Sequence, residues 1–184
     1  MLIDDAQREM RTALLGGFMG QFVSGILWLA SAALATWSTQ YWAIGVLIVG
    51  GFFIYPATLL GLWLIGHKAA ISKGNPFNAL GTQVAFVLPL SLPVVGAAAL
   101  YRPEWFYPAF MVVLGAHYLP FVTTYGMKMF YVLAAVLVGA GITLALYVTL
   151  PATAGAWFTA ATLLVFAGLG GYLVRREAAQ PRLA

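Results

Sequence analysis

Six long apolar runs dominate the chain. They lie at 13–37, 42–65, 79–100, 105–122, 129–149 and 153–173, and none of them contains Asp, Glu, Lys or Arg. Each is close to the roughly 20 residues that a helix needs to cross a bilayer. Barrel strands would instead alternate apolar and polar residues over about ten positions. The pattern therefore predicts an all-α integral membrane protein, a bundle of six transmembrane helices forming a single membrane domain over residues 1–184.

Short polar breaks separate these runs. Gly74-Asn75-Pro76 predicts a turn, with Asn78 as the N-cap of the third span. The segments 101–104 and 150–153 predict tight hairpins. Because every connection is short, the breaks leave no room for a soluble domain.

The basic residues predict an orientation. If the breaks alternate between the two sides of the membrane, one side holds Arg8, Arg11, Lys68, Lys73, Lys128, Arg175, Arg176 and Arg182. The other side holds Arg102 alone. The positive-inside rule then places both termini in the cytoplasm. Aromatic residues agree, because the predicted outer boundary carries Trp37, Trp42, Trp105 and Trp157.

Composition limits the function classes. Hydrophobic residues make up 62% of the chain and charged residues 8%, and there is no cysteine. This excludes disulfides, thiolate nucleophiles and Cys-ligated metals. The net charge is +4, but the basic residues are spread over the breaks and the chain ends rather than gathered in one patch. Nucleic acid is therefore not expected as a partner. One alternative stays open for the first run: Ala33-Leu34-Ala35 has the pattern of a signal-peptide cleavage site, and cleavage there would leave five spans.

The first run carries a stripe of small and polar residues. At 100° per residue, one face gathers Gly17, Gln21, Ser24, Gly25, Trp28 and Ala32. In one interpretation this face is a seam where two helices pack closely. In the other, Gln21 and Ser24 line a path or a pocket for a ligand.

His117 is the most unusual single residue within the runs. Ionisable residues inside a membrane are costly and usually face protein or water. Counting the helical rise places His117 and Gln21 at similar depths, Gln83 nearer the cytoplasm and Tyr55 near the midplane. The four residues therefore define a candidate polar layer. Three interpretations of His117 stay open: it bonds a neighbouring helix, it contacts a solute or proton, or it reaches the membrane interface without a partner.

Prolines interrupt three of the runs. Pro56, Pro89 with Pro93, and Pro120 each remove a backbone hydrogen bond and are candidate kinks. Transporters use the carbonyls of broken helices at substrate sites. Prolines are also common in membrane helices for structural reasons alone.

Several catalytic chemistries lack their residues. No run contains a carboxylate, which argues against proton relays and paired-acid hydrolysis. Ser24 with His117 could form a nucleophile–base pair, but the glycine that precedes the serine of intramembrane serine proteases is missing. His67 and His117 could in principle ligate haem. No cofactor or metal is expected.

Two segments support a resemblance to a known family. Asn75-Pro76-Phe77-Asn78-Ala79-Leu80-Gly81 and Gly115-Ala116-His117-Tyr118-Leu119-Pro120-Phe121 resemble the most recognisable segments of a family of small multi-spanning bacterial membrane proteins of unknown function. The resemblance implies a bacterial inner membrane. It implies no activity.

Three function classes follow. The first is a small-solute transporter or channel, indicated by the candidate polar layer and the prolines. The second is a non-catalytic accessory or assembly protein, indicated by uncharged spans. The third, resting on His67 and His117 alone, is a redox or hydrolytic membrane enzyme. The expected partners are the lipid bilayer, an unknown small solute and a second copy of the chain.

Overall fold

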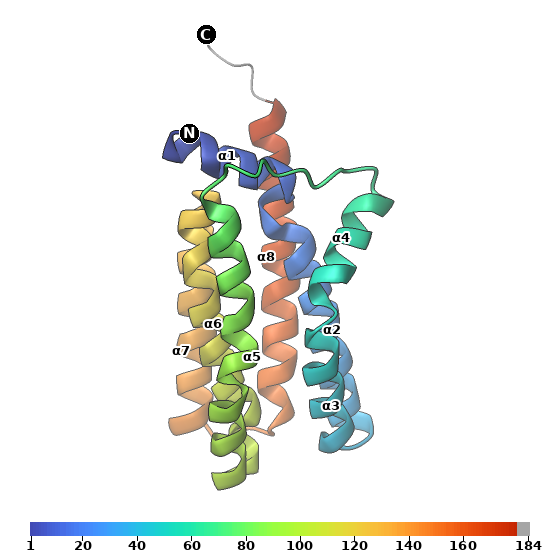
Figure 1. Ribbon diagram of the computed structural model, residues 1–184. Helices are drawn as coiled ribbons and strands as arrows, with labels where there is room; N and C mark the ends of the chain where they lie inside the picture. Colours follow the sequence, from blue (N-terminus) through green and yellow to red (C-terminus); the bar gives the residue numbers. More distant parts are fainter. Residues whose placement is uncertain (180–184) are drawn as a thin grey trace.

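The computed structural model describes residues 1–179, and the regular secondary structure in this part of the chain consists of helices joined by loops (Figure 1). It contains eight α-helices and two 3₁₀ turns. Their bounds are α1 Ile3–Ala13, η1 Leu15–Gly17, α2 Phe18–Trp37, α3 Gln40–Gly51, α4 Ile54–Leu64, α5 Phe77–Tyr101, η2 Pro103–Trp105, α6 Phe106–Tyr125, α7 Met129–Leu146 and α8 Thr153–Ala179.

Five helical stretches are long and apolar enough to cross a membrane. They are Leu15–Trp37, Phe77–Tyr101, Pro103–Tyr125, Met129–Leu146 and Thr153–Glu177. A sixth candidate is the pair α3 and α4, whose axes are bent by 65° at a short break. By helix length and hydropathy, the chain is therefore an integral membrane protein with five spans, or six if the bent pair crosses as one.

The break divides the run predicted at 42–65. It follows Gly50 and Gly51, which are weak helix formers, and it precedes Pro56 in the first turn of α4. Proline cannot donate to the carbonyl four residues earlier, here that of Phe52, and its ring clashes with that carbonyl. The run predicted as one span, with a candidate kink at Pro56, is therefore two helices, and the break lies beside that proline.

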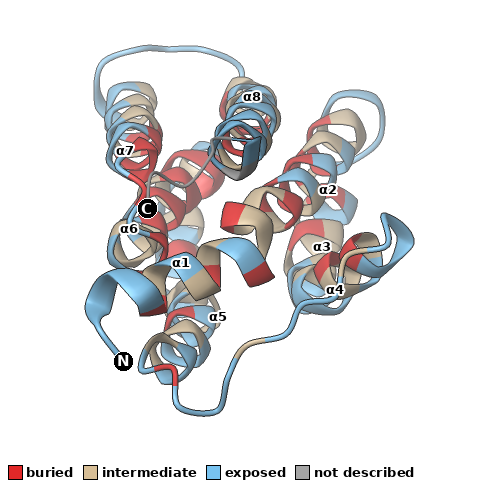
Figure 2. Cartoon of the chain, turned by 90° about the horizontal axis from the view of Figure 1, so that it is seen from above, coloured by how far each residue is buried: buried red, intermediate tan, exposed pale blue. Residues whose placement is uncertain are grey.

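Helix α1 lies across one end of the bundle (Figures 1 and 2). We call this end, which also holds the 65–76 loop, the α1 end. Ala6, Met10 and Ala13 are buried at helical spacing, whereas Asp4 and Arg8 are exposed. This is the pattern of a helix that rests on an apolar surface. The sequence analysis missed α1 because it searched for long uncharged runs.

Polar contacts hold α1 to the ends of two spans. The Arg11 guanidinium donates to both carboxylate oxygens of Glu177 on α8, at 2.9 and 2.7 Å, and to the carbonyl of Tyr125 on α6. Gln7 donates to the carbonyl of Thr123 at 2.7 Å. Helix α1 therefore ties α6 to α8.

Asn75 joins α1 to the start of α5. Its side chain is almost fully buried, and its amide donates to the Ala6 carbonyl at 3.0 Å and to Glu9 at 2.8 Å. Its carbonyl oxygen accepts from the backbone N–H of Phe77 at 2.9 Å, which caps α5. The expected cap, Asn78, was wrong, because α5 begins one residue earlier and Asn78 lies exposed in its first turn.

Glu9 is the acceptor at the centre of this contact. Besides Asn75, it accepts from the backbone N–H of Ser72 at 2.7 Å and from the Ser72 hydroxyl at 3.0 Å. These bonds, that of the Asn75 side chain foremost, lower the pKa of Glu9 because they favour the charged carboxylate.

Close helix packing builds the interior. Helix α2 packs against α8 and α3, and α6 packs against α7 and α5. Glycines allow these approaches: a Cβ on Gly141 of α7 would lie 2.7 Å from the Pro108 carbonyl of α6, and one on Gly25 of α2 would lie 2.9 Å from Leu164 of α8. Small residues at such contacts are typical of membrane helices.

We predict that Asn75→Ala destabilises the protein far more than Asn78→Ala. The first variant removes a buried group that pairs with three partners, and should lower the free energy of unfolding by about 1–3 kcal/mol. The second removes an exposed amide and should change it by less than about 0.5 kcal/mol. Denaturant unfolding in detergent measures both, and equal effects would contradict the capping role of Asn75.

Candidate functional site

Gln21 is the most anomalous polar residue among the described spans. Its side chain is 3% exposed, and neither its amide nitrogen nor its amide oxygen has a hydrogen-bond partner. Each such unpaired atom costs about 1–3 kcal/mol relative to a solvated one. Groups of this kind in native proteins usually mark a place for water, an ion or a ligand.

Three hydroxyl-bearing residues of α2 and α6 lie near the level of Gln21 in the bundle. Helices α2 and α6 run antiparallel. A Cβ on Gly17 would lie 3.3 Å from the Tyr125 hydroxyl, and the Ser24 hydroxyl lies beside that of Tyr118. Gln21 falls between Gly17 and Ser24 on the buried face of α2, so this register places the residue between the levels of the two tyrosines along the bundle. We call Gln21, Ser24, Tyr118 and Tyr125 the Gln21 cluster.

Phe130 of α7 fixes the two tyrosine rings. Its ring stacks on that of Tyr118, with centroids 6.1 Å apart, and on that of Tyr125, with centroids 5.7 Å apart. Phe130 is itself fully buried. The cluster therefore combines a few polar atoms with rigid aromatic walls, which is the usual composition of a small-molecule site.

The Gln21 cluster is closed toward both ends of the bundle. Toward the α1 end, Arg11 bonds the Tyr125 carbonyl and Glu177. Toward the opposite end, Trp28 packs between α2 and α6 against Tyr107 and Phe110, with centroids 6.0 and 5.2 Å away. Ser31 reinforces this aromatic contact through a 3.0 Å hydrogen bond to the Tyr107 hydroxyl. Gln21 therefore lies between a layer of polar contacts and a layer of packed aromatic rings.

His117 lies on another side of α6. Its ring packs edge-on against Phe121, with centroids 5.2 Å apart, and lies against Val84 of α5. The Nδ1 atom is buried without a partner. His117 thus belongs to the seam between α5 and α6.

The remaining members of the candidate polar layer lie on the outside. Tyr55 is 64% exposed at the start of α4, and Gln83 is exposed on α5. The structure therefore brings Gln21 and Ser24 together, and adds Tyr118 and Tyr125, which the sequence analysis did not single out. Their spacing of seven residues, two turns of one helix face, was a signal that could have found them.

The candidate kinks differ in their surroundings. Pro89 and Pro93 lie within the continuous helix α5, and Pro120 lies within α6. The carbonyl of Pro120 accepts from the Thr124 hydroxyl at 3.0 Å. Pro56 is the one that lies beside a helix break.

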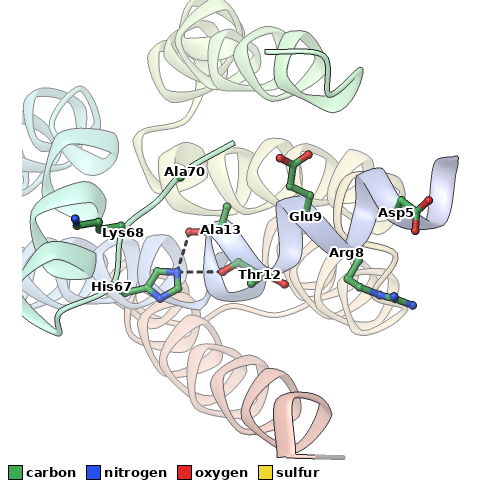
Figure 3. Close-up of a pocket in the computed structure, with 8 residues that line it drawn as sticks. All are labelled: Asp5, Arg8, Glu9, Thr12, Ala13, His67, Lys68 and Ala70. Atoms are coloured by element: carbon green, nitrogen blue, oxygen red, sulfur yellow. Dashed lines mark hydrogen bonds between the residues drawn. The ribbon is translucent and has the colours of Figure 1, made fainter. Parts of the chain in front are cut away.

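A shallow open cleft lies at the α1 end (Figure 3). It has a volume of about 360 Å³ and is lined by Asp5, Arg8, Glu9, Thr12, Ala13, His67, Lys68 and Ala70. His67 Nε2 donates to the carbonyls of Thr12 and Ala13, at 3.0 and 3.2 Å, where α1 ends. These carbonyls have no partner within α1, so His67 caps the helix. Within residues 1–179, no three His, Asp or Glu side chains gather to hold a metal.

We predict that Gln21→Leu raises the stability of the solute-free protein. The substitution removes two unpaired polar atoms at similar volume, so the free energy of unfolding should rise by about 1–3 kcal/mol. The matched control is Thr159→Val, because the buried Thr159 hydroxyl is already satisfied by the Gly155 carbonyl at 2.8 Å. The control should not gain stability. A loss of stability in Gln21→Leu would show that Gln21 serves helix packing.

Comparison with known proteins identifies a family for the chain. The model of a family of unknown function, DUF7010, matches residues 3–172, which include the segments at 75–81 and 115–121. No curated protein and no solved structure shows a significant match. Since the matched region covers nearly the whole chain, the protein belongs to the DUF7010 family, a family of unknown function.

Proposed function

We propose that the protein carries a small solute across a bacterial inner membrane, with the Gln21 cluster as its binding site. The observation that carries this proposal is the buried amide of Gln21, whose nitrogen and oxygen both lack a partner. A bundle whose only role was structural would gain stability by replacing such a group with an apolar one. The position of the cluster between the polar contacts of Arg11 and the packed rings of Trp28 suits a carrier.

A six-span topology is part of the proposal. Helix α3 begins beside η2, where Gln40 donates to the Pro103 carbonyl at 3.2 Å. After α4 ends, His67 bonds the carbonyls of α1 at the other end of the bundle. The bent pair therefore runs the length of the bundle, as a single interrupted span would.

Charge supports an orientation with both termini in the cytoplasm. The α1 end carries Arg8, Arg11, Lys68, Lys73, Lys128, Arg175 and Arg176, whereas Arg102 lies at the opposite end (Figure 1). Arg182 lies outside the described residues. At the Arg102 end, Trp157 packs on Trp37 with centroids 5.9 Å apart, as expected at a membrane boundary.

The broken span gives a route for movement. Helix α4 touches α2 beside the Gln21 cluster: a Cβ on Gly20 would lie 3.5 Å from the Thr58 hydroxyl, and one on Gly61 would lie 2.7 Å from Met19. The break between α3 and α4 allows α4 to move without carrying α3 with it. Interrupted helices serve this purpose in known transporters.

An accessory or assembly protein is the second candidate. The exposure of helix α5 supports this role. Val84 and Val95 are the only buried residues of α5, and α6 is the span against which α5 packs. The rest of this 25-residue helix presents an apolar surface to lipid, to a second copy of the chain or to another membrane protein.

The topology can be tested by thiol labelling, because the chain has no cysteine. We expect a membrane-impermeant maleimide to label Arg102→Cys in intact spheroplasts. Lys68→Cys should be labelled only after the membrane is permeabilised. The reverse pattern would contradict the orientation. Labelling of both Lys68→Cys and Ser38→Cys, which lies in the exposed loop before α3, in intact spheroplasts would contradict a crossing by α3 and α4.

Solute binding can be tested by thermal unfolding of the purified protein against a panel of ions and metabolites. A true ligand at about 100 times its Kd should add about 2.7 kcal/mol of stability. We expect this shift to disappear in Gln21→Leu and to persist in Gln83→Leu, the same substitution at an exposed site. If no compound shifts the wild type, or if all three proteins shift alike, the Gln21 cluster is not a solute site and the accessory role is favoured.

A further inference from the structure

We infer that the ligand of the Gln21 cluster is a small neutral molecule with a hydrogen-bond donor and an acceptor side by side, such as a carboxamide, a urea or a polyol. This inference rests on the proposed function, since it names the class of solute that the site would bind. The inference combines three features: the unpaired atoms of Gln21, the charges around the Gln21 cluster, and the distance between the two ends of the cluster.

The free atoms of Gln21 define the complementary group. Its nitrogen offers donors and its oxygen offers an acceptor, and both are unpaired. A ligand that satisfies both must present an acceptor next to a donor. The hydroxyls of Ser24, Tyr118 and Tyr125 can each donate or accept, so they adapt to either arrangement. A purely apolar solute would leave the amide as costly as it is without a ligand.

The surroundings exclude a charged solute. The residues of α2, α3, α4 and α7 include no Asp, Glu, Lys or Arg, and those of α5 include none either. At the α1 end, Arg11, which bonds the Tyr125 carbonyl, is paired with Glu177 at 2.7 Å. His117 faces α5. An ion at Gln21 would therefore lose its hydration without meeting a counter-charge, which costs several kcal/mol per ion by general estimates.

The closed ends limit the size of the ligand. Gly17 lies at the level of Tyr125, and Trp28 begins the aromatic contact with Tyr107. Eleven residues of helix separate Gly17 from Trp28, which corresponds to about 16 Å along the axis. Between these levels the stacked rings of Tyr118 and Phe130 form flat walls. These levels limit the ligand to a small molecule.

The test uses three solutes with the same planar skeleton: neutral acetamide, anionic acetate and cationic acetamidinium. The protein is reconstituted into liposomes, and uptake is followed by osmotic swelling with the rate of empty liposomes subtracted. Larger neutral amides, ureas and polyols, each beside a charged counterpart, extend the series. Wild type, Gln21→Leu and Thr159→Val are compared throughout.

We expect uptake of acetamide or a larger neutral solute in wild type and Thr159→Val, with at least about a tenfold reduction in Gln21→Leu, the effect of one lost hydrogen bond. Charged counterparts should enter no faster than into empty liposomes. Uptake of a charged solute that Gln21→Leu abolishes would overturn the neutral class and leave the proposed function standing. Equal rates for all solutes in all three proteins, with no ligand found by thermal unfolding, would overturn both.

Discussion

A bilayer offers no hydrogen-bond partners, so every polar group placed in it must be satisfied by the protein itself. This constraint accounts for the helical fold and for the fate of most polar side chains in the spans. Thr58, Ser91, Thr124, Thr143 and Thr159 each donate to the carbonyl four residues earlier in their own helix. Ser31 pairs with Tyr107 and with the Ala43 carbonyl. The amide of Gln21 differs from these side chains because it is unpaired, and we interpret it as a group that pairs with a ligand from outside the chain.

At the α1 end, polar groups are satisfied by contacts between different helices rather than within one helix. Helix α1 lies over the ends of α6 and α8 and supplies partners for polar groups that would otherwise be left free. Arg11 reaches a helix-end carbonyl and Glu177, while Asn75 serves the first amide of α5 and a carbonyl of α1. The bundle is thus sealed at this end by paired charges and amides, and at the level of Trp28 by packed aromatic rings. The two seals differ in chemistry, and a carrier that opened them in turn would break polar contacts on one side and ring contacts on the other.

The features of the fold that depend on local composition could be predicted from the sequence. The long apolar runs located the candidate spans, and the stripe on the first run contains residues that the structure buries on α2. The missed features depend on contacts between distant segments. Asn75 rather than Asn78 caps α5 because Ala6 and Glu9 hold it there. The candidate polar layer grouped Gln21 with Tyr55, Gln83 and His117 because of their similar estimated depths in the membrane. Depth in the membrane does not determine the direction in which a side chain points around its helix. Tyr118 and Tyr125 join Gln21 only through the register between α2 and α6.

In our proposal Gln21 is a ligand-binding group rather than a packing residue, and the reactivity of a cysteine at this position distinguishes the two roles. The chain has no cysteine, so Gln21→Cys would be the single reactive thiol, with Leu163→Cys, at a fully buried position on α8, as its control. The account predicts that a small neutral thiol reagent modifies Gln21→Cys in membranes, that a bound solute slows this reaction, and that Leu163→Cys stays unmodified. If Gln21→Cys is as inert as Leu163→Cys under all conditions, Gln21 lies in a dry interior and the account is contradicted.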